Sequence, residues 1–249
     1  MNNIEKFVNS KFYRGFEWFY RLIFLNLLIL IISFSFASIP FFIWYLNQEL
    51  GFLIYIALIL FAVLFIPAFI TSMFVIKHYA DDNTGNFFVV YFKYFIETIK
   101  SIYLVELILV PIFLIILYGF FHYWQLLGPE YYHPDAFGIF TIIACAISFF
   151  FVIFFFFMFI NLSLLVCYFR MKTKDYIVMT FKFSMKFMFQ SLLAVLVLFI
   201  PLVLLFLIKM DFVPIYFILG ISLPEYLIYL GNRSKFNFLQ RNIDEINKI

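Results

Sequence analysis

Five polar side chains lie inside long apolar stretches of the sequence, where such groups can bind a substrate or an ion: Asn26, Glu106, Asn161, Ser163 and Glu225. A polar group in the core of a bilayer is costly, and such groups often mark substrate or ion pathways. Glu106 and Glu225 each lie within about two helical turns of the expected inner membrane surface. They can therefore converge on a cavity in the inner leaflet, paired with Arg14 or Arg21. The alternative is that both carboxylates are wetted or ion-paired and serve the structure alone.

Signatures of catalysis are missing from the sequence. It contains no Gly-rich phosphate loop, no nucleophile elbow, no HExxH helix and no Cys/His cluster. The ionisable residues that follow the third expected span do not have the spacing of a metal site: His122, Glu130, His133 and Asp135. We therefore expect a protein that is not an enzyme and that holds no cofactor and no metal.

The composition is that of an integral membrane protein. Hydrophobic residues make up 66% of the chain and charged residues 12%, and the mean hydropathy is +1.07, far from the values of soluble domains. A bilayer core about 30 Å thick requires about 20 apolar residues per helix. The apolar runs therefore predict an all-α fold, a six-span transmembrane helical bundle, with spans near residues 22–44, 51–75, 102–123, 139–168, 191–207 and 213–230.

The distribution of cations predicts the orientation of this bundle. All but Lys209 of the 17 lysines and arginines fall in the two terminal segments and in the loops around residues 76–103 and 168–190. The positive-inside rule places these four segments in the cytoplasm. We therefore expect a multi-pass protein of a bacterial cell membrane, N-in/C-in with both termini cytoplasmic, made of an interfacial segment 1–21, a membrane domain 22–230 and a tail 231–249.

A short amphipathic helix that leads into a proline-containing span occurs twice. The first copy has the order Phe88, Phe92, Lys93, Ser101, Pro111, and the second has the order Ile177, Phe181, Lys182, Ser191, Pro201. The helical parts align at an offset of 89 residues and the Ser-to-Pro parts at 90, so the second copy contains one extra residue. The repeat predicts two cytoplasmic elbows, and the prolines predict kinks that are either static or act as gating hinges.

Each elbow has a polar face. The first also has apolar side chains at helical spacing, at Phe88, Phe92, Phe95, Ile96 and Ile99, and the second continues its polar stripe from Lys182 and Lys186 to Gln190. We expect both helices to lie flat on the membrane. Because the cations follow a membrane face, the expected partners are the lipid bilayer and a docking protein rather than nucleic acid. The candidate docking residues are Lys93, Glu97, Lys100, Lys182 and Lys186.

Three stretches of the sequence resemble the YesL-type family of bacterial membrane proteins. They are the opening of the first span, Phe16–Leu28, the first elbow, Phe88–Ser101, and the second elbow, Lys172–Gln190. The similarity of pattern covers roughly residues 16–229. It implies an association with carbohydrate uptake and breakdown systems, often beside ABC-type sugar permeases. The family has no established biochemical activity and no defined site residues, so the resemblance assigns none here.

Three functions follow as hypotheses. The favoured one is a non-catalytic accessory subunit that docks on another membrane complex through its elbows, with an ABC transporter permease or ATPase subunit for carbohydrate transport as the expected partner. The second is a membrane permease or transport subunit in its own right, since the elbows resemble the coupling helices through which permeases contact an ATPase, although the EAA-type loop of importer permeases is not visible. The third and least favoured is an intramembrane enzyme.

Overall fold

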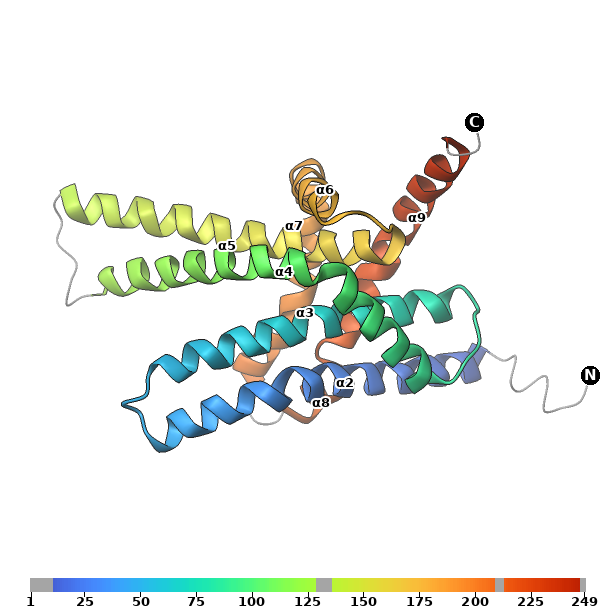
Figure 1. Ribbon diagram of the computed structural model, residues 1–249, viewed down its shortest axis with the longest axis horizontal. Helices are drawn as coiled ribbons and strands as arrows, with labels where there is room; N and C mark the ends of the chain where they lie inside the picture. The colour runs from blue at the N-terminus through green and yellow to red at the C-terminus, as the bar shows by residue number, and fades with distance from the viewer. Residues whose placement is uncertain (1–10, 129–135, 209–212, 247–249) are drawn as a thin grey trace, which may run out of the picture. The chain divides into compact units, whose positions relative to one another are not determined.

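The described part of the chain is entirely helical. The computed structural model describes residues 11–128, 136–208 and 213–246. Its helices, in chain order, are α2 (Lys11–Leu46), α3 (Phe52–Ala80), α4 (Phe87–Leu126), α5 (Ala136–Tyr168), α6 (Thr173–Lys186), α7 (Met188–Ile208), α8 (Val213–Leu219) and α9 (Ser222–Ile246) (Figure 1). The predicted all-α fold is confirmed for these residues. Glu130, His133, Asp135 and Lys209 lie outside them, as do the first ten residues of the predicted interfacial segment.

The helices have the length and composition of membrane spans. Five of the described helices are long and apolar enough to cross a bilayer, and α8 with α9 make a sixth such segment if the two count as one span, bent by 45° at their break. These are the features of a multi-pass membrane protein. The predicted sixth span is therefore not one straight helix, and the number of spans and the side on which the termini lie remain predictions.

Two predicted boundaries fall inside continuous helices. Helix α2 runs from Lys11 through the first span without a break, so residue 21 is not a helix end. Helix α4 likewise joins the first elbow to the third span, and its first Gly or Pro is Pro111. Because nothing between Phe87 and Pro111 interrupts the backbone hydrogen bonds, the prediction of a separate first elbow was wrong.

The second elbow is a separate helix. Helix α6 ends at Lys186, and Phe187 adopts φ −114° and ψ 35° before α7 begins at Met188. This break lies between Lys182 and Ser191, where the repeat contains its extra residue. The additional residue is thus accommodated as a helix end. Gln190 consequently belongs to α7 and does not continue the polar stripe of α6 as predicted.

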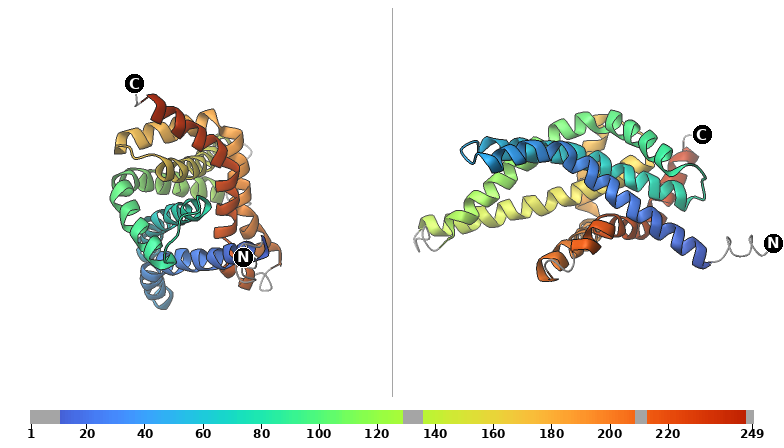
Figure 2. Two further views of the ribbon diagram at one scale, coloured as in Figure 1. Left: turned by 90° about the vertical axis from the view of Figure 1, so that its right-hand side faces the viewer. Right: turned by 90° about the horizontal axis from the view of Figure 1, so that it is seen from below.

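The chain divides into two compact units. The first comprises residues 1–99 and 196–249, and the second comprises residues 100–195. In the first unit α2 and α3 lie side by side as an antiparallel pair (Figures 1 and 2), and α8 and α9 both pack against α2. In the second unit α6 packs on α5, and Phe113 and Phe120 of α4 contact phenylalanine rings of α5.

Each unit contains a helix with a continuously buried stretch. Residues 67–73 of α3 are all buried, with Ala68, Phe69, Ile70 and Met73 fully inaccessible. The corresponding part of α5, residues 160–168, is also buried throughout. Lipid tails are as apolar as leucine, so the close packing of such helices depends on van der Waals contact and buried hydrogen bonds rather than on the hydrophobic effect.

Candidate functional site

Asn26 bridges the break between α8 and α9. This fully buried side chain of α2 donates from Nδ2 to the carbonyl oxygens of Tyr216 and Phe217, at 3.1 and 2.7 Å. Its Oδ1 accepts from the backbone N–H groups of Ile221 and Ser222, at 2.7 and 3.1 Å. One amide thus serves four backbone groups at the break, where an apolar environment offers few other partners; among them, the Tyr216 carbonyl also accepts from the Gly220 N–H at 2.8 Å. Asn26 is a positioning residue, which its isolation in the sequence did not reveal.

Gly220 explains why the helix breaks there. A Cβ at this position would lie 2.4 Å from Cδ2 of Tyr216 and 2.6 Å from its carbonyl oxygen, so a larger residue does not have room. Pro224 follows in the first turn of α9, where a missing N–H costs nothing. Together, Gly220, Ser222 and Pro224 are a helix-end and helix-start signal that the strong hydropathy of the segment concealed.

Glu225 is completely buried three residues beyond Ser222, the first residue of α9. Its exposed fraction is 0%, and the Ser72 side chain and the Met73 backbone of α3 lie close to its carboxylate. Neither carboxylate oxygen, however, has a partner at hydrogen-bond geometry. The Ser72 hydroxyl instead donates to the carbonyl of Phe69, at 3.0 Å. A carboxylate in such a position is unusual, since buried charges are normally paired.

Further hydroxyl groups of the first unit are buried without hydrogen-bond partners. They belong to Thr71, Tyr91 and Ser222. The Tyr91 phenol lies within electrostatic range of Glu225, Ser222 precedes Glu225 by three residues on the same helix face, and Thr71 adjoins Ser72. We define Glu225, Ser72, Tyr91 and Ser222 as the Glu225 cluster. It contributes one carboxyl and three hydroxyl groups.

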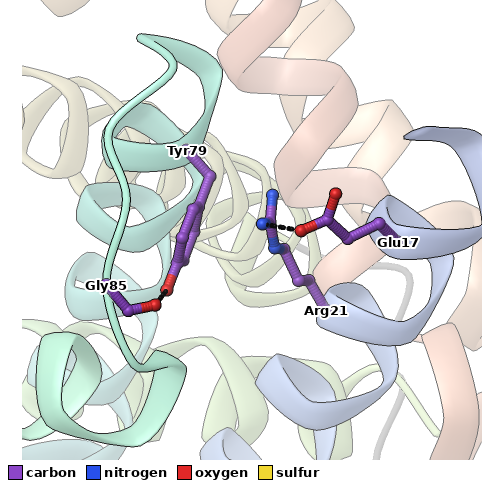
Figure 3. A network of polar contacts seen from close by, with 4 residues as sticks. All are labelled: Glu17, Arg21, Tyr79 and Gly85. Atoms are coloured by element: carbon purple, nitrogen blue, oxygen red, sulfur yellow. Dashed lines mark hydrogen bonds and ion pairs between the residues drawn. The ribbon is translucent and has the colours of Figure 1, made fainter. Parts of the chain in front are cut away.

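Arg21 is engaged elsewhere. Its guanidinium forms an ion pair with Glu17 and lies over the ring of Tyr79, 3.8 Å from the centroid. Tyr79 in turn donates from its hydroxyl to the carbonyl of Gly85, at 3.1 Å (Figure 3). The expected pairing of Arg21 with a buried glutamate is therefore wrong. This network instead connects α2 to the turn between α3 and α4. Arg14 is exposed on α2.

The same turn is held from α9. Arg233 donates to the carbonyl of Ala80 and to Oδ1 of Asp81, both at 2.9 Å. Gly85 has φ +155°, a conformation that favours glycine, and a Cβ there would lie 3.0 Å from Cγ2 of Val90. The turn that begins the first elbow is thus fixed by contacts from two helices that lie far from it in sequence.

Glu106 belongs to the second unit. It is 7% exposed on α4, and its Oε1 has no hydrogen-bond partner. Glu225 lies in the first unit, and each carboxylate is described within its own unit. The predicted convergence of the two on one cavity therefore stays a prediction.

Asn161 connects three helices of the second unit. The two N–H groups of its Nδ2 are shared among three acceptors, the Phe157 carbonyl of α5 at 2.9 Å, Oγ of Ser191 on α7 at 2.8 Å and Oγ of Ser184 on α6 at 3.3 Å. Ser163 has a simpler role, since its hydroxyl donates to the Phe159 carbonyl of its own helix at 2.8 Å. Asn161 thus links the second elbow to α5 and α7, whereas the hydrogen bond of Ser163 stays within α5.

Helix α6 buries hydroxyl groups and exposes its cations. Tyr176, Thr180 and Ser184 recur every four residues and form the buried stripe. The Tyr176 hydroxyl donates to the Phe169 carbonyl at 2.7 Å, and burial raises the pKa of this phenol above its ordinary value. Lys182 and Lys186 are exposed as predicted.

The first elbow has the same arrangement. Tyr91 and Thr98 are buried, while four of the five predicted apolar-face residues are exposed: Phe88, Phe92, Ile96 and Ile99. The charged residues Lys93, Glu97 and Lys100 are exposed as well. Both elbows therefore bury a narrow stripe that carries hydroxyl groups and leave apolar and charged side chains outside, a division that hydropathy did not predict.

Comparison with protein-family models, with curated proteins and with solved structures finds no match to this chain.

Proposed function

We propose that this protein is a non-catalytic accessory subunit of another membrane complex and that it docks through its elbows. The observation that carries the proposal is the outer face of α6, where Met185 is 56% exposed beside Lys182 and Lys186, and where Phe181 is 50% exposed although its ring also contacts Phe154 of α5. Aromatic and methionine side chains are enriched in protein interfaces. The resemblance to the YesL-type family supports a carbohydrate ABC transport system as the setting.

The attachment of α6 favours binding. Hydrogen bonds from Asn161 to Ser184 and from Tyr176 to Phe169 hold the inner face of the helix on α5. A surface that is ordered before binding loses less conformational entropy when a partner arrives. The outer face of α6 is therefore ordered before a partner binds. The basic residues at its edge can pair with acidic groups on the partner or with anionic lipid.

Purification from native membranes in mild detergent tests this function. We expect a stoichiometric permease or ATPase subunit to co-purify with the wild-type chain and to be lost from the Lys182→Glu/Lys186→Glu variant. The Arg14→Glu/Arg241→Glu variant changes the same amount of charge at exposed positions outside the elbows and should retain the partner. Equal recovery of the partner with both variants would contradict docking through α6.

The second candidate, a transport subunit, is favoured by a different observation. A broken span beside a buried carboxylate is an arrangement found in transporters, where discontinuous helices line the binding site. Glu225 follows the α8–α9 break, and Glu106 is the other buried carboxylate of the described residues. Glu225→Gln and Glu106→Gln separate the two functions. Loss of uptake with the assembly intact would favour a transport path, and loss of assembly would favour docking.

A further inference from the structure

At the start of a helix, free backbone N–H groups usually stabilise a carboxylate. Those near Glu225 already donate to other acceptors. The N–H groups of Ile221 and Ser222 donate to Asn26, and the N–H of Glu225 itself donates to the Ile221 carbonyl at 3.1 Å. Pro224 has no N–H. The start of α9 therefore offers Glu225 a favourable dipole but few free donors. The charge of this side chain must be balanced in some other way.

The helices packed around Glu225 do not supply a cation. Helix α3 contributes Ser72 and the Met73 backbone, and helix α4 contributes the Tyr91 phenol. Helix α2 carries Arg21, but this guanidinium is paired with Glu17 and stacked on Tyr79.

Three further titratable groups on these helices are engaged elsewhere. On α3, His78 contacts the Tyr94 hydroxyl at 3.1 Å and Tyr79 donates to Gly85. On α9, Arg233 is paired with Asp81. Among the described residues, the groups that act on the Glu225 carboxylate are the Ser72 side chain and the Met73 backbone, and neither carries a positive charge.

A proton is the cation that suits this cluster. A metal ion needs several oxygen or nitrogen ligands around it, and the described residues contain no group of three or more His, Cys, Asp or Glu side chains that could hold one. A proton needs only one carboxylate oxygen and then becomes a hydrogen-bond donor. The Ser72 hydroxyl already donates to the Phe69 carbonyl, so its oxygen remains available to accept from a protonated Glu225.

We propose that Glu225 is a buried proton-binding site and that exchange of its proton is coupled to movement at the α8–α9 break. Uptake of one proton converts the carboxylate, with charge −1, to a neutral carboxyl, and no other bond is made or broken. Because Glu225 lies in the first turn of α9, loss of the proton leaves a charge that water can reach only if α9 moves away from α3. The site lies apart from the elbow α6 in sequence and does not depend on the docking function.

Infrared difference spectroscopy of the full chain in lipid nanodiscs tests the proposal. On acidification we expect a carboxyl C=O stretching band that is absent from Glu225→Gln and retained in Glu106→Gln, which removes the buried carboxyl of the other unit. Glutamine has the shape of a protonated glutamate, so this variant should fold. If it does not, Glu225→Asp should shift the same band instead of removing it.

Two results would overturn the proposal. The first is a pH difference spectrum that is unchanged by substitution of Glu225. The second is a Glu225 band that responds to sodium or potassium at constant pH, because the cluster would then bind an alkali cation rather than a proton. Coupling to the break is supported only if a spin label at Leu223→Cys changes its mobility over the same pH range in the wild-type background and not in Glu225→Gln.

Discussion

The amide of Asn26 carries both donor and acceptor atoms, which is why a single side chain can serve both sides of the α8–α9 break. An aspartate would keep the bonds from Ile221 and Ser222 but lose those to Tyr216 and Phe217. A leucine would lose all four. In a membrane the backbone groups released in this way have no water to replace the lost partner.

We expect Asn26→Leu to lower the free energy of unfolding by at least about 2 kcal/mol. Asn26→Asp should have an intermediate effect. Thermal unfolding in detergent, followed by circular dichroism, measures both. Asn232→Leu is the matched control, because the Asn232 side chain donates only to the Ile228 carbonyl of its own helix. An equal loss in Asn26→Leu and Asn232→Leu would show that the bridge does not matter.

Gly220 is the second residue on which the break depends. Gly220→Ala introduces a Cβ within 2.4 Å of Tyr216, so we expect a destabilisation of about 1–3 kcal/mol. Gly119, inside α4, has nothing within 4 Å of the equivalent position. Gly119→Ala should therefore be neutral or stabilise the helix by up to about 1 kcal/mol. Opposite signs for the two variants in a thermal unfolding assay are the expected result.

Ionisation of the Tyr176 phenol lowers the stability of the second unit at alkaline pH. Burial raises the pKa of this phenol above its ordinary value of 10.0, so the folded protein favours the neutral form. The stabilisation from this shift is fully present below pH 10 and is lost as the pH rises through the folded pKa.

We expect Tyr176→Phe to cost about 1 kcal/mol at neutral pH through the lost hydrogen bond and to lose less stability than the wild type at alkaline pH. Chemical unfolding across this pH range measures the difference. The exposed Tyr103→Phe should follow the wild type, and a parallel curve for Tyr176→Phe would contradict the assignment.

The sequence indicated which polar residues are buried in the helices but not which contacts they make. Asn26, Glu106, Asn161 and Glu225 stand out because polar atoms are rare in apolar runs, and all four are buried. The role of Asn26 depends on backbone groups 190 residues or more away, at a helix break that contains Gly220. No local pattern contains that information.

Asn161 links two helices, because its side chain on α5 donates to Ser184 of the second elbow, α6. We expect Asn161→Leu to release α6 from α5 and to raise the mobility of a spin label placed at Lys182→Cys. Ser163→Ala, two residues away, removes a hydroxyl that bonds only within α5 and should leave the label unchanged. An immobile label in Asn161→Leu would show that the remaining contacts of α6 are sufficient.

The elements themselves were predicted unevenly. Hydropathy located the helical segments well, since each apolar run is close to or above the length that a bilayer requires. It placed helix ends poorly, because α2 and α4 continue beyond their apolar runs without a helix-breaking residue. It also missed the break after Leu219, where Gly220 and Pro224 are embedded in an apolar sequence. The end of α6 falls where the second repeat has its extra residue, although the predicted polar stripe continued to Gln190.

For the whole molecule the orientation in the membrane is the central prediction. We expect Lys93→Cys and Lys182→Cys to be unreactive toward an impermeant thiol reagent in intact cells and reactive after permeabilisation. Gln48→Cys, in the exposed turn between α2 and α3, should react in intact cells. The native Cys145 and Cys167 are buried, which keeps the background low. Reaction of either elbow from outside would reverse the predicted topology.

The division into units affects how the protein is made. The second unit, residues 100–195, interrupts the first unit in the chain, so the ribosome completes the second unit before the first. Asn26 consequently enters the membrane long before Tyr216 and Ile221 are synthesised. Until then its amide must be shielded by the insertion machinery, by lipid headgroups or by water. A nascent chain arrested before α8 should therefore remain bound to the translocon.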